Sequence, residues 1–307
     1  MQKNGIVTKG VGGLYEVLLS DGSRILCRGK GILKKDDGKL LVGDRVSVKD
    51  AQSERGEAVI GAIAPRDNAL IRPPLANVGA IVLTVAAVSP MPALSTLDRM
   101  LSVCEYEGIL PILALTKTDL SEDAAERLGA LYLAAGYEVF PVSSVTGEGT
   151  DALRARIVSI AREEKTVAFA GASGVGKSTL LGTLFPHLSL ATGALSEKTQ
   201  RGRHTTRTVE LFPYEGGFLA DTPGFSLLDF ERFDFIPFEA LPYTFKEFRA
   251  YIGRCRYDDC THTKEEECAI REAVASGAVA KSRHDSYLEL YPILKEKDLL
   301  ARRKNKK

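Results

Sequence analysis

The sequence of 307 residues has almost no net charge, because its 41 lysines and arginines nearly balance its 40 aspartates and glutamates. Any nucleic acid would therefore have to be held by local basic patches, rather than by the electrostatic field of the whole protein. The chain also lacks a run approaching the roughly 18 apolar residues that span a bilayer, and its first residues, MQKNGIVTKG, carry no secretion pattern. We therefore expect a cytoplasmic protein with no membrane partner.

Cysteines are few, and their number is odd: five in the whole chain. In a reducing compartment an odd number argues against a disulfide framework and leaves metal ligands or buried thiols. The composition, 44% hydrophobic and 26% charged, is too apolar for a disordered chain. The length predicts two or three domains.

Residues 1–65 show short alternating apolar and polar runs, interrupted by turn signals such as Asp21-Gly22 and Gly43-Asp44. Many short strands in a small segment favour a closed β-barrel, which removes exposed edges. An OB-fold is the predicted type, and an SH3-like barrel fits nearly as well. A polar, proline-rich stretch at 64–77 is interpreted as a linker.

Residues 66–230 alternate between continuous apolar runs and helical stretches, which predicts a central α/β domain with a buried parallel sheet. The strands are expected at 79–86, 109–116, 137–143 and 166–172, and the helices around 94–107, 121–135 and 149–163. Residues 231–307 then predict a mostly α-helical C-terminal domain, with helices around 239–251, 265–276 and 280–304.

The segment GASGVGKS at 171–178 follows an apolar run and precedes a helical stretch, the context of a P-loop. Its glycines allow backbone amides to curl around phosphates, Lys177 neutralises the outer phosphates, and Ser178 ligates Mg²⁺. The expected nucleotide-binding residues here are Gly171, Ala172, Ser173, Gly174, Val175, Gly176, Lys177, Ser178 and Thr179.

Two more motifs belong with the P-loop. Downstream, DTPG offers Asp221 to Mg²⁺ and the amide of Gly224 to the γ-phosphate, a weak signal alone and a strong one beside a P-loop. Upstream, TKTD resembles the guanine-selecting element of GTPases, in which Asp119 would accept from the base and Lys117 would pack over it. A polar strand-end loop is the alternative interpretation of TKTD.

The order of these motifs is unusual. Thr116, Lys117 and Asp119, and the loop with Ser143 and Ser144 that resembles the segment backing the guanine, precede the P-loop. In ordinary GTPases they follow DxxG, so the chain resembles the circularly permuted GTPases. Permutation is tolerated where the old ends lie close together on the surface. The segment after Gly224 then runs into the C-terminal helices, so its response to nucleotide can move them.

The residue that positions the attacking water is not the usual glutamine, because Phe225 follows Gly224 and can neither donate nor accept a hydrogen bond. His204, in GRHTTR, is our candidate and joins Lys177 as a predicted catalytic residue. Its neighbours Thr205 and Thr206 are both candidate Mg²⁺ ligands, and the sequence does not choose between them. The alternative is that His204 is an ordinary polar residue.

A second cluster predicts a metal site outside the nucleotide motifs. Cys255, Cys260, His262 and Cys268 lie within fourteen residues and offer a closed tetrahedral Cys3His set. Four protein ligands leave no open position, so the expected ion is one structural zinc per chain. Reduced thiols beside a surface histidine are the alternative.

A β-barrel, a permuted GTPase with TKTD, GASGVGKS, GRHTTR and DTPGF, and a Cys3His cluster together resemble the bacterial ribosome-small-subunit-dependent GTPase A (RsgA) family. The resemblance implies a monomeric Mg²⁺-dependent GTPase that binds the 30S subunit and its 16S rRNA through the barrel and the zinc domain. It implies hydrolysis of GTP to GDP on ribosome stimulation, late in small-subunit maturation. Residues 295–307, with seven basic and two acidic side chains, suit phosphate contacts or form a solvated helix end.

Two other functions are compatible with these motifs. The chain could be an RNA-binding scaffold that holds GTP with negligible hydrolysis. A P-loop ATPase acting on nucleic acids is the third option, which TKTD disfavours.

Overall fold

The computed structural model describes residues 2–29, 39–49, 58–188, 209–221 and 230–304. The chain divides into two compact units. The first comprises Met1–Val82, Asp151–Ala170 and Lys177–Gly224, and the second comprises Leu83–Thr150, Gly171–Gly176 and Phe225–Lys307. Among the described helices, none combines the length and apolar character needed to cross a membrane.

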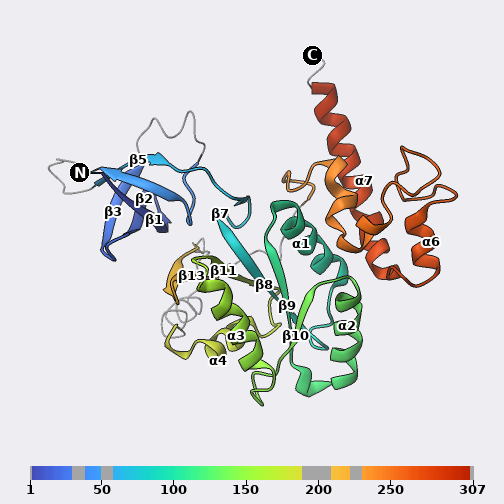
Figure 1. Ribbon diagram of the computed structural model, residues 1–307, viewed down its shortest axis with the longest axis horizontal. Helices are drawn as coiled ribbons and strands as arrows, with labels where there is room; N and C mark the ends of the chain where they lie inside the picture. The colour runs from blue at the N-terminus through green and yellow to red at the C-terminus, as the bar shows by residue number, and fades with distance from the viewer. Residues whose placement is uncertain (1, 30–38, 50–57, 189–208, 222–229, 305–307) are drawn as a thin grey trace, which may run out of the picture. The chain divides into compact units, whose positions relative to one another are not determined.

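The N-terminal strands form a closed barrel in the order β1-β2-β3-β5-β4 (Figure 1). They are β1 (Gln2–Val11), β2 (Leu14–Leu19), β3 (Arg24–Gly29), β4 (Arg45–Lys49) and β5 (Ala58–Ile63). Pairing of β1 with β4 closes the barrel, and β3 runs parallel to β5 while the other neighbours are antiparallel. This five-stranded Greek-key order is that of the OB-fold, which confirms the first of the two predicted barrel types.

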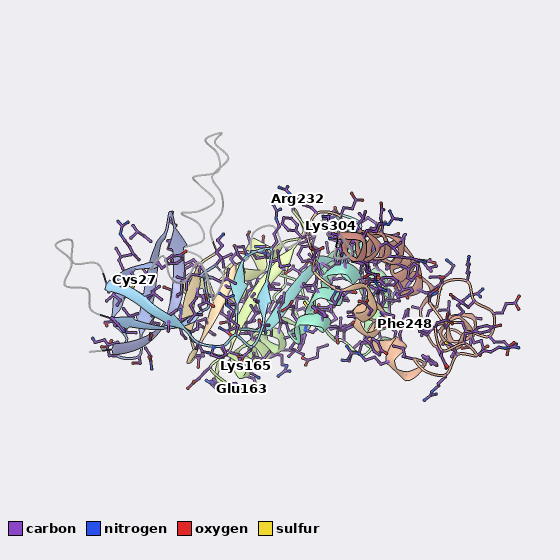
Figure 2. The ribbon with its side chains drawn as sticks, turned by 90° about the horizontal axis from the view of Figure 1, so that it is seen from above. Cys27, Glu163, Lys165, Arg232, Phe248 and Lys304 are labelled. Atoms are coloured by element: carbon purple, nitrogen blue, oxygen red, sulfur yellow. The ribbon has the colours of Figure 1, made fainter. Side chains whose placement is uncertain are left out.

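Alternation along the strands fills the barrel. On β4, Val46 and Val48 are buried while Arg45 and Lys49 are exposed, as expected for a strand with one face on a core. The buried set is Val7, Val17, Leu19, Cys27, Leu40, Val46, Val48 and Ile60. Burial raises the pKa of Cys27 (Figure 2) to about 11, so this thiol is a core residue rather than a reactive one.

The central sheet has six strands in the order β10-β9-β8-β11-β13-β12. They are β8 (Val78–Ala86), β9 (Leu110–Thr116), β10 (Glu138–Pro141), β11 (Thr166–Gly171), β12 (Leu211–Tyr214) and β13 (Gly217–Asp221). In the second unit β9 pairs in parallel with β10; in the first unit β11 pairs in parallel with β13, and β12 returns antiparallel. The four predicted strands are confirmed. Strands β8, β9 and β11 are apolar and mostly buried, whereas β10 at the edge of the sheet is only half-buried.

Helices follow the strands as expected, at α1 (Leu94–Glu107), α2 (Glu122–Ala134), α3 (Thr150–Ala161) and α4 (Lys177–Leu184). Helix α2 starts where the Ser121 hydroxyl accepts from the amide of Ala124, with Glu122 and Asp123 in its first turn, a normal N-cap with favourable charges. Helix α1 ends at Gly108, which adopts the left-handed conformation (φ 67°) that favours glycine.

The C-terminal part differs from the prediction in detail. The predicted helix 239–251 is two 3-10 segments, η4 (Phe238–Thr244) and η5 (Lys246–Ala250), because Pro242 has no amide hydrogen for an α-helical bond. Phe245, which lies between the two segments, stacks on Phe248 of η5 with ring centroids 5.0 Å apart; Phe248 is labelled in Figure 2. Beyond them lie α6 (Ala269–Ala275) and α7 (Lys281–Lys304).

Besides the hairpin of β12 and β13, two short features lie outside the predicted set. The expected linker at 64–77 contains a two-stranded sheet, β6 (Ala69–Leu70) and β7 (Leu75–Ala76). The TKTD segment continues into a 3-10 turn, η2 (Thr118–Leu120). Both are too short to give a periodic signal in the sequence.

Candidate functional site

The P-loop at 171–178 joins β11 to α4, which is the strand–loop–helix context that the motif requires. Gly174 and Gly176 have φ angles of 80° and 92°, values that L-residues rarely adopt, so the chain can turn here only with glycine. Ala172, Ser173 and Gly174 are exposed. The loop therefore presents its backbone amides to solvent at the N-terminus of a helix, where anions bind.

Helix α4 is anchored at its other end. The guanidinium of Arg154, on α3, donates to the carbonyls of Leu184 (3.0 Å) and Thr183 (3.2 Å). These are carbonyls of the last helical turn, which have no partner within the helix. A cation at the C-terminus also complements the helix dipole, so the C-terminal end of α4 is held against α3.

TKTD lies at the end of β9 and holds the P-loop. The Thr116 hydroxyl, 2% exposed, donates to the Val175 carbonyl at 2.5 Å. The Lys117 ammonium donates to the carbonyls of Gly174 (2.8 Å) and Ser89 (2.5 Å). The Thr116 hydroxyl is thus directed at the phosphate loop and acts on the position of that loop.

Lys117 adopts a left-handed backbone conformation with φ 59°. A non-glycine residue held there carries strain, and such residues concentrate at functional sites. The conformation lets the chain turn sharply from β9 into η2 while the lysine side chain crosses the P-loop. The aliphatic stem of Lys117 can then pack against a flat ring, as the motif predicts.

Asp119 is exposed, and its Oδ1 accepts from the Ser143 hydroxyl at 2.6 Å. The Ser143 oxygen also accepts from the amides of Val145 and Thr146, at 3.2 Å each. Ser143 is fully buried and Ser144 half-buried. The Asp119 carboxylate thus joins TKTD to the 143–149 loop. The sequence analysis connected these two segments only by their order.

Gly149 closes that loop. It has φ 70°, and a Cβ atom here would lie 1.9 Å from the Pro141 carbonyl oxygen. Only glycine allows this approach. The loop after β10 is therefore held close to the strand end, which fixes Ser143 next to Asp119.

Lys177 begins α4, directly after Gly176, and Asp221 ends β13. Their ammonium and carboxylate form an ion pair, with the side chains 16% and 32% exposed. The P-loop lysine and the acid of DxxG are therefore neighbours. The other predicted members of this site, Gly224, His204, Thr205 and Thr206, lie outside the described residues.

The Cys3His residues converge. The ligand atoms of Cys255, Cys260, His262 and Cys268 all lie within 4.8 Å of one another. Cys255 Sγ is 3.9 Å from Cys268 Sγ, and these two sulfurs are 3.5 and 3.6 Å from His262 Nδ1. A tetrahedron with zinc–sulfur bonds of about 2.3 Å and a zinc–nitrogen bond of about 2.0 Å has edges of about 3.5–3.8 Å. The cluster fits a single zinc ion.

The electrostatics of the cluster agree with a cation. Burial raises the pKa of the Cys260 thiol to about 12 and raises that of Cys268, while it lowers the pKa of His262. The imidazole is thus kept neutral, as a ligand must be. A divalent ion would supply the charge that turns the thiols into thiolates.

Helix α7 holds the loop that carries these ligands. Tyr287 donates its hydroxyl to the Thr261 carbonyl at 2.7 Å, and His284 Nε2 lies 2.8 Å from the His262 carbonyl. His262 itself has a left-handed backbone, with φ 59°. The two contacts from α7 hold this backbone in place. Sequence reasoning missed both supporting residues, because they lie sixteen or more positions from the nearest ligand, Cys268, and belong to no motif.

Comparison with known proteins agrees with this geometry. The RsgA GTPase family matches residues 63–231 and the RsgA N-terminal domain family matches residues 4–60. The small ribosomal subunit biogenesis GTPase RsgA of Geobacillus thermodenitrificans is 43% identical over 297 residues, which cover 95% of this chain and 98% of that protein. RsgA of Bacillus subtilis is 40% identical over 301 residues, with the same coverage.

Two solved structures resemble the whole chain. YjeQ from Thermotoga maritima matches with a TM-score of 0.77 at 31% identity, over 96% of this chain and 99% of that one. YloQ, described as a circularly permuted GTPase, matches with a TM-score of 0.74 at 35% identity, over 97% of this chain and 96% of that one. With its family matches and its guanine elements ahead of its P-loop, this chain belongs to the RsgA family of circularly permuted GTPases.

Proposed function

We propose that this GTPase binds the small ribosomal subunit during its biogenesis and hydrolyses GTP when the subunit stimulates it. The observation that carries the nucleotide assignment is the attachment of the P-loop to the guanine motif through Thr116 and Lys117. Phosphate and base recognition are thereby built on one connected set of loops. The named relatives, small ribosomal subunit biogenesis GTPases, support the partner.

The phosphates would bind along the amides of 171–176, with Lys177 neutralising the outer ones. Ser178 and Asp221 would hold Mg²⁺, together with Thr205 or Thr206. The ion would supply positive charge that neutralises the phosphates. Lys177 is now paired with Asp221, so it would exchange this carboxylate for phosphate oxygens. The amide of Gly224 is proposed to meet the γ-phosphate, and His204 to orient the attacking water.

The guanine base would lie over Lys117, with Asp119 accepting from its N1 and N2 hydrogens and the loop at Ser143 and Ser144 behind it. Adenine offers no such pair of donors at the same edge. The bond from Ser143 to Oδ1 of Asp119 fixes the plane of the carboxylate. Base recognition therefore depends on a carboxylate that is already oriented before the ligand arrives.

We propose three domains for the work: the OB-fold at 1–65, the permuted GTPase at 66–230 and the zinc-binding domain at 231–307. One zinc ion held by Cys255, Cys260, His262 and Cys268 would have a structural role, since four protein ligands leave no position for a substrate. The barrel, the zinc domain and the basic end of α7 would contact 16S rRNA. A chain that works on assembling ribosomes acts in the cytoplasm, and we propose that it does so as a monomer.

The test measures phosphate release from GTP and from ATP, each with and without purified 30S subunits. We expect slow release from GTP alone, a large increase with subunits, and no stimulated release from ATP. Lys177→Ala is the negative control for the nucleotide site. GTP binding without subunit-stimulated release would instead support the scaffold function, and equal use of ATP would overturn guanine selectivity.

A further inference from the structure

One arginine of the C-terminal domain is enclosed by charged and aromatic partners. The side chain of Arg283, on α7, is 1% exposed. Its NH1 donates to Asp98 Oδ1 at 2.6 Å, while Nε and NH2 donate to the two oxygens of Glu247 at 2.6 and 3.1 Å. The guanidinium also lies over the Phe245 ring, 4.8 Å from its centroid. A buried bidentate ion pair between an arginine and a carboxylate adopts a single geometry.

These partners come from separate parts of the second unit. Glu247 lies on η5 in the C-terminal domain, whereas Asp98 lies in the second turn of α1. Tyr132, at the end of α2, donates its hydroxyl to the same Asp98 oxygen at 2.9 Å. Arg283 therefore fastens α7 to two helices of the GTPase domain, and Figure 1 shows α7 beside α1.

The charges need one another. Asp98 is fully buried; burial raises its pKa, and Arg283 opposes that rise. Without the guanidinium, two carboxylates would remain with no cation to balance them, and a buried unbalanced charge displaces its surroundings or takes up a proton. The position of α1 thus depends on Arg283.

Helix α1 leads directly to the nucleotide loops. The residues before it, 87–93, contain Ser89, whose carbonyl accepts the Lys117 ammonium at 2.5 Å. In the described residues no side chain caps the start of α1 at Ala93. The loop is held at its other end by the Ala87 amide, which donates to the Thr116 carbonyl at 2.9 Å, so α1 and the end of β9 together set its position. Lys117 in turn donates to the P-loop carbonyl of Gly174 at 2.8 Å.

We propose that Arg283 is a positioning residue for guanine-nucleotide binding, which acts through Asp98 and α1 on the Ser89 carbonyl that holds Lys117. The zinc-binding domain then supports the base site, and α7 is the helix that holds this domain in place. The proposal rests on GTP binding by this chain. It assigns to Arg283 no role in phosphate chemistry, because Lys177 and Asp221 make none of these contacts.

The experiment compares Arg283→Met with the parent in GTP titrations of the full chain without subunits. Chemistry is slow there, so KM reports dissociation. We expect KM for GTP and the dissociation constant of fluorescent mant-GDP to rise about tenfold, the range of couplings carried through packed networks, while kcat at saturating GTP stays within twofold. Lys281→Met, on the same helix with a 78% exposed side chain, is the matched control and should leave both constants unchanged.

A second variant keeps the test decisive if Arg283→Met does not fold. Tyr132→Phe removes only the hydroxyl that donates to Asp98 and should raise KM about threefold, a smaller change through the same network. Zinc content, measured for each variant, reports the integrity of the C-terminal domain. Unchanged KM in both variants, or a lower kcat at unchanged KM, overturns the proposal. A parent that does not bind GTP overturns the proposed function instead.

Discussion

At the residue scale, we propose that base selection depends on Asp119. We expect Asp119→Asn to shift preference from guanine towards xanthine nucleotides. An amide can donate to the xanthine 2-oxo group but cannot accept from both guanine donors, and unpaired polar groups cost about 1–3 kcal/mol, or roughly ten- to a hundredfold in affinity. Competition of GTP and XTP for bound mant-GDP measures the change.

The control for this substitution is Asp123→Asn, in the first turn of α2, which should bind GTP like the parent. In the parent, the buried Ser143 orients the Asp119 carboxylate. The side-chain amide of Asp119→Asn should therefore take the same orientation. Unchanged GTP affinity in the Asp119 variant would show that TKTD is an ordinary strand-end loop here.

Thr116 gives a different expectation. Thr116→Val removes the hydroxyl that donates to Val175 and leaves a buried carbonyl unpaired, at a cost of about 1–3 kcal/mol. Because this contact holds the P-loop and not the base, affinity should fall by the same factor for GTP and for ITP, which lacks the 2-amino group. Isothermal titration of both nucleotides tests this. A loss confined to GTP would place Thr116 at the base after all.

The motifs pointed to particular residues of the nucleotide loops, but they did not predict the contacts that these residues make. TKTD singled out Thr116 and Asp119, and a sequence pattern cannot show that one is directed at a backbone carbonyl and the other at Ser143. Ser89 escaped notice altogether, because it acts through its carbonyl and any residue has one. The sequence analysis also missed Arg283, since a buried ion pair between distant segments leaves no periodic signal.

At the scale of elements, prediction succeeded where apolar periodicity was long. Helix α1 spans Leu94–Glu107 as predicted, because fourteen residues give a clear pattern and Gly108 ends it. The region 239–251 failed because its apolar residues fit a helix while Pro242 does not. The hairpin from β12 to β13 turns at Glu215 and Gly216, both with positive φ, and its first strand was too short to detect.

Among residues 251–268, which carry the zinc ligands, only His262 and Cys268 are buried, so we expect the folding of this loop to depend on the metal. We expect Cys255→Ser to lose the bound zinc and to expose residues 251–280 to limited proteolysis, because the metal supplies folding free energy only to the unit that contains it. Elemental analysis should give about one zinc per parent chain and close to none in the variant.

Cys27→Ala is the matched control, because this cysteine lies in the barrel core and is not a member of the Cys3His cluster. It should keep its zinc even where the barrel is weakened. A metal-free parent whose C-terminal helices resist protease would contradict the structural role of zinc.

At the scale of the whole molecule, permutation decides what the nucleotide can move. The chain leaves β13 at Asp221, the partner of Lys177, and continues through residues outside the described set into the C-terminal helices. The sequence order predicts that the nucleotide response of this segment can move the C-terminal domain. Arg283 of α7 is bonded to Asp98 of α1, so we expect such motion to work against a buried ion pair.

The catalytic step connects these scales, because the residue that orients the water should act only once the partner is bound. Phe225 stands where many GTPases have a glutamine, which leaves His204 as the candidate. We expect His204→Ala to lower subunit-stimulated kcat by roughly 10² or more while GTP affinity and subunit binding stay near those of the parent, the pattern of a contact made only in the transition state. The exposed His187 provides the matched control, His187→Ala, whose stimulated rate should equal that of the parent. Stimulated phosphate release within a few-fold of the parent in the His204 variant, with the subunit still bound, would remove His204 from the mechanism and pass the role to the ribosome itself.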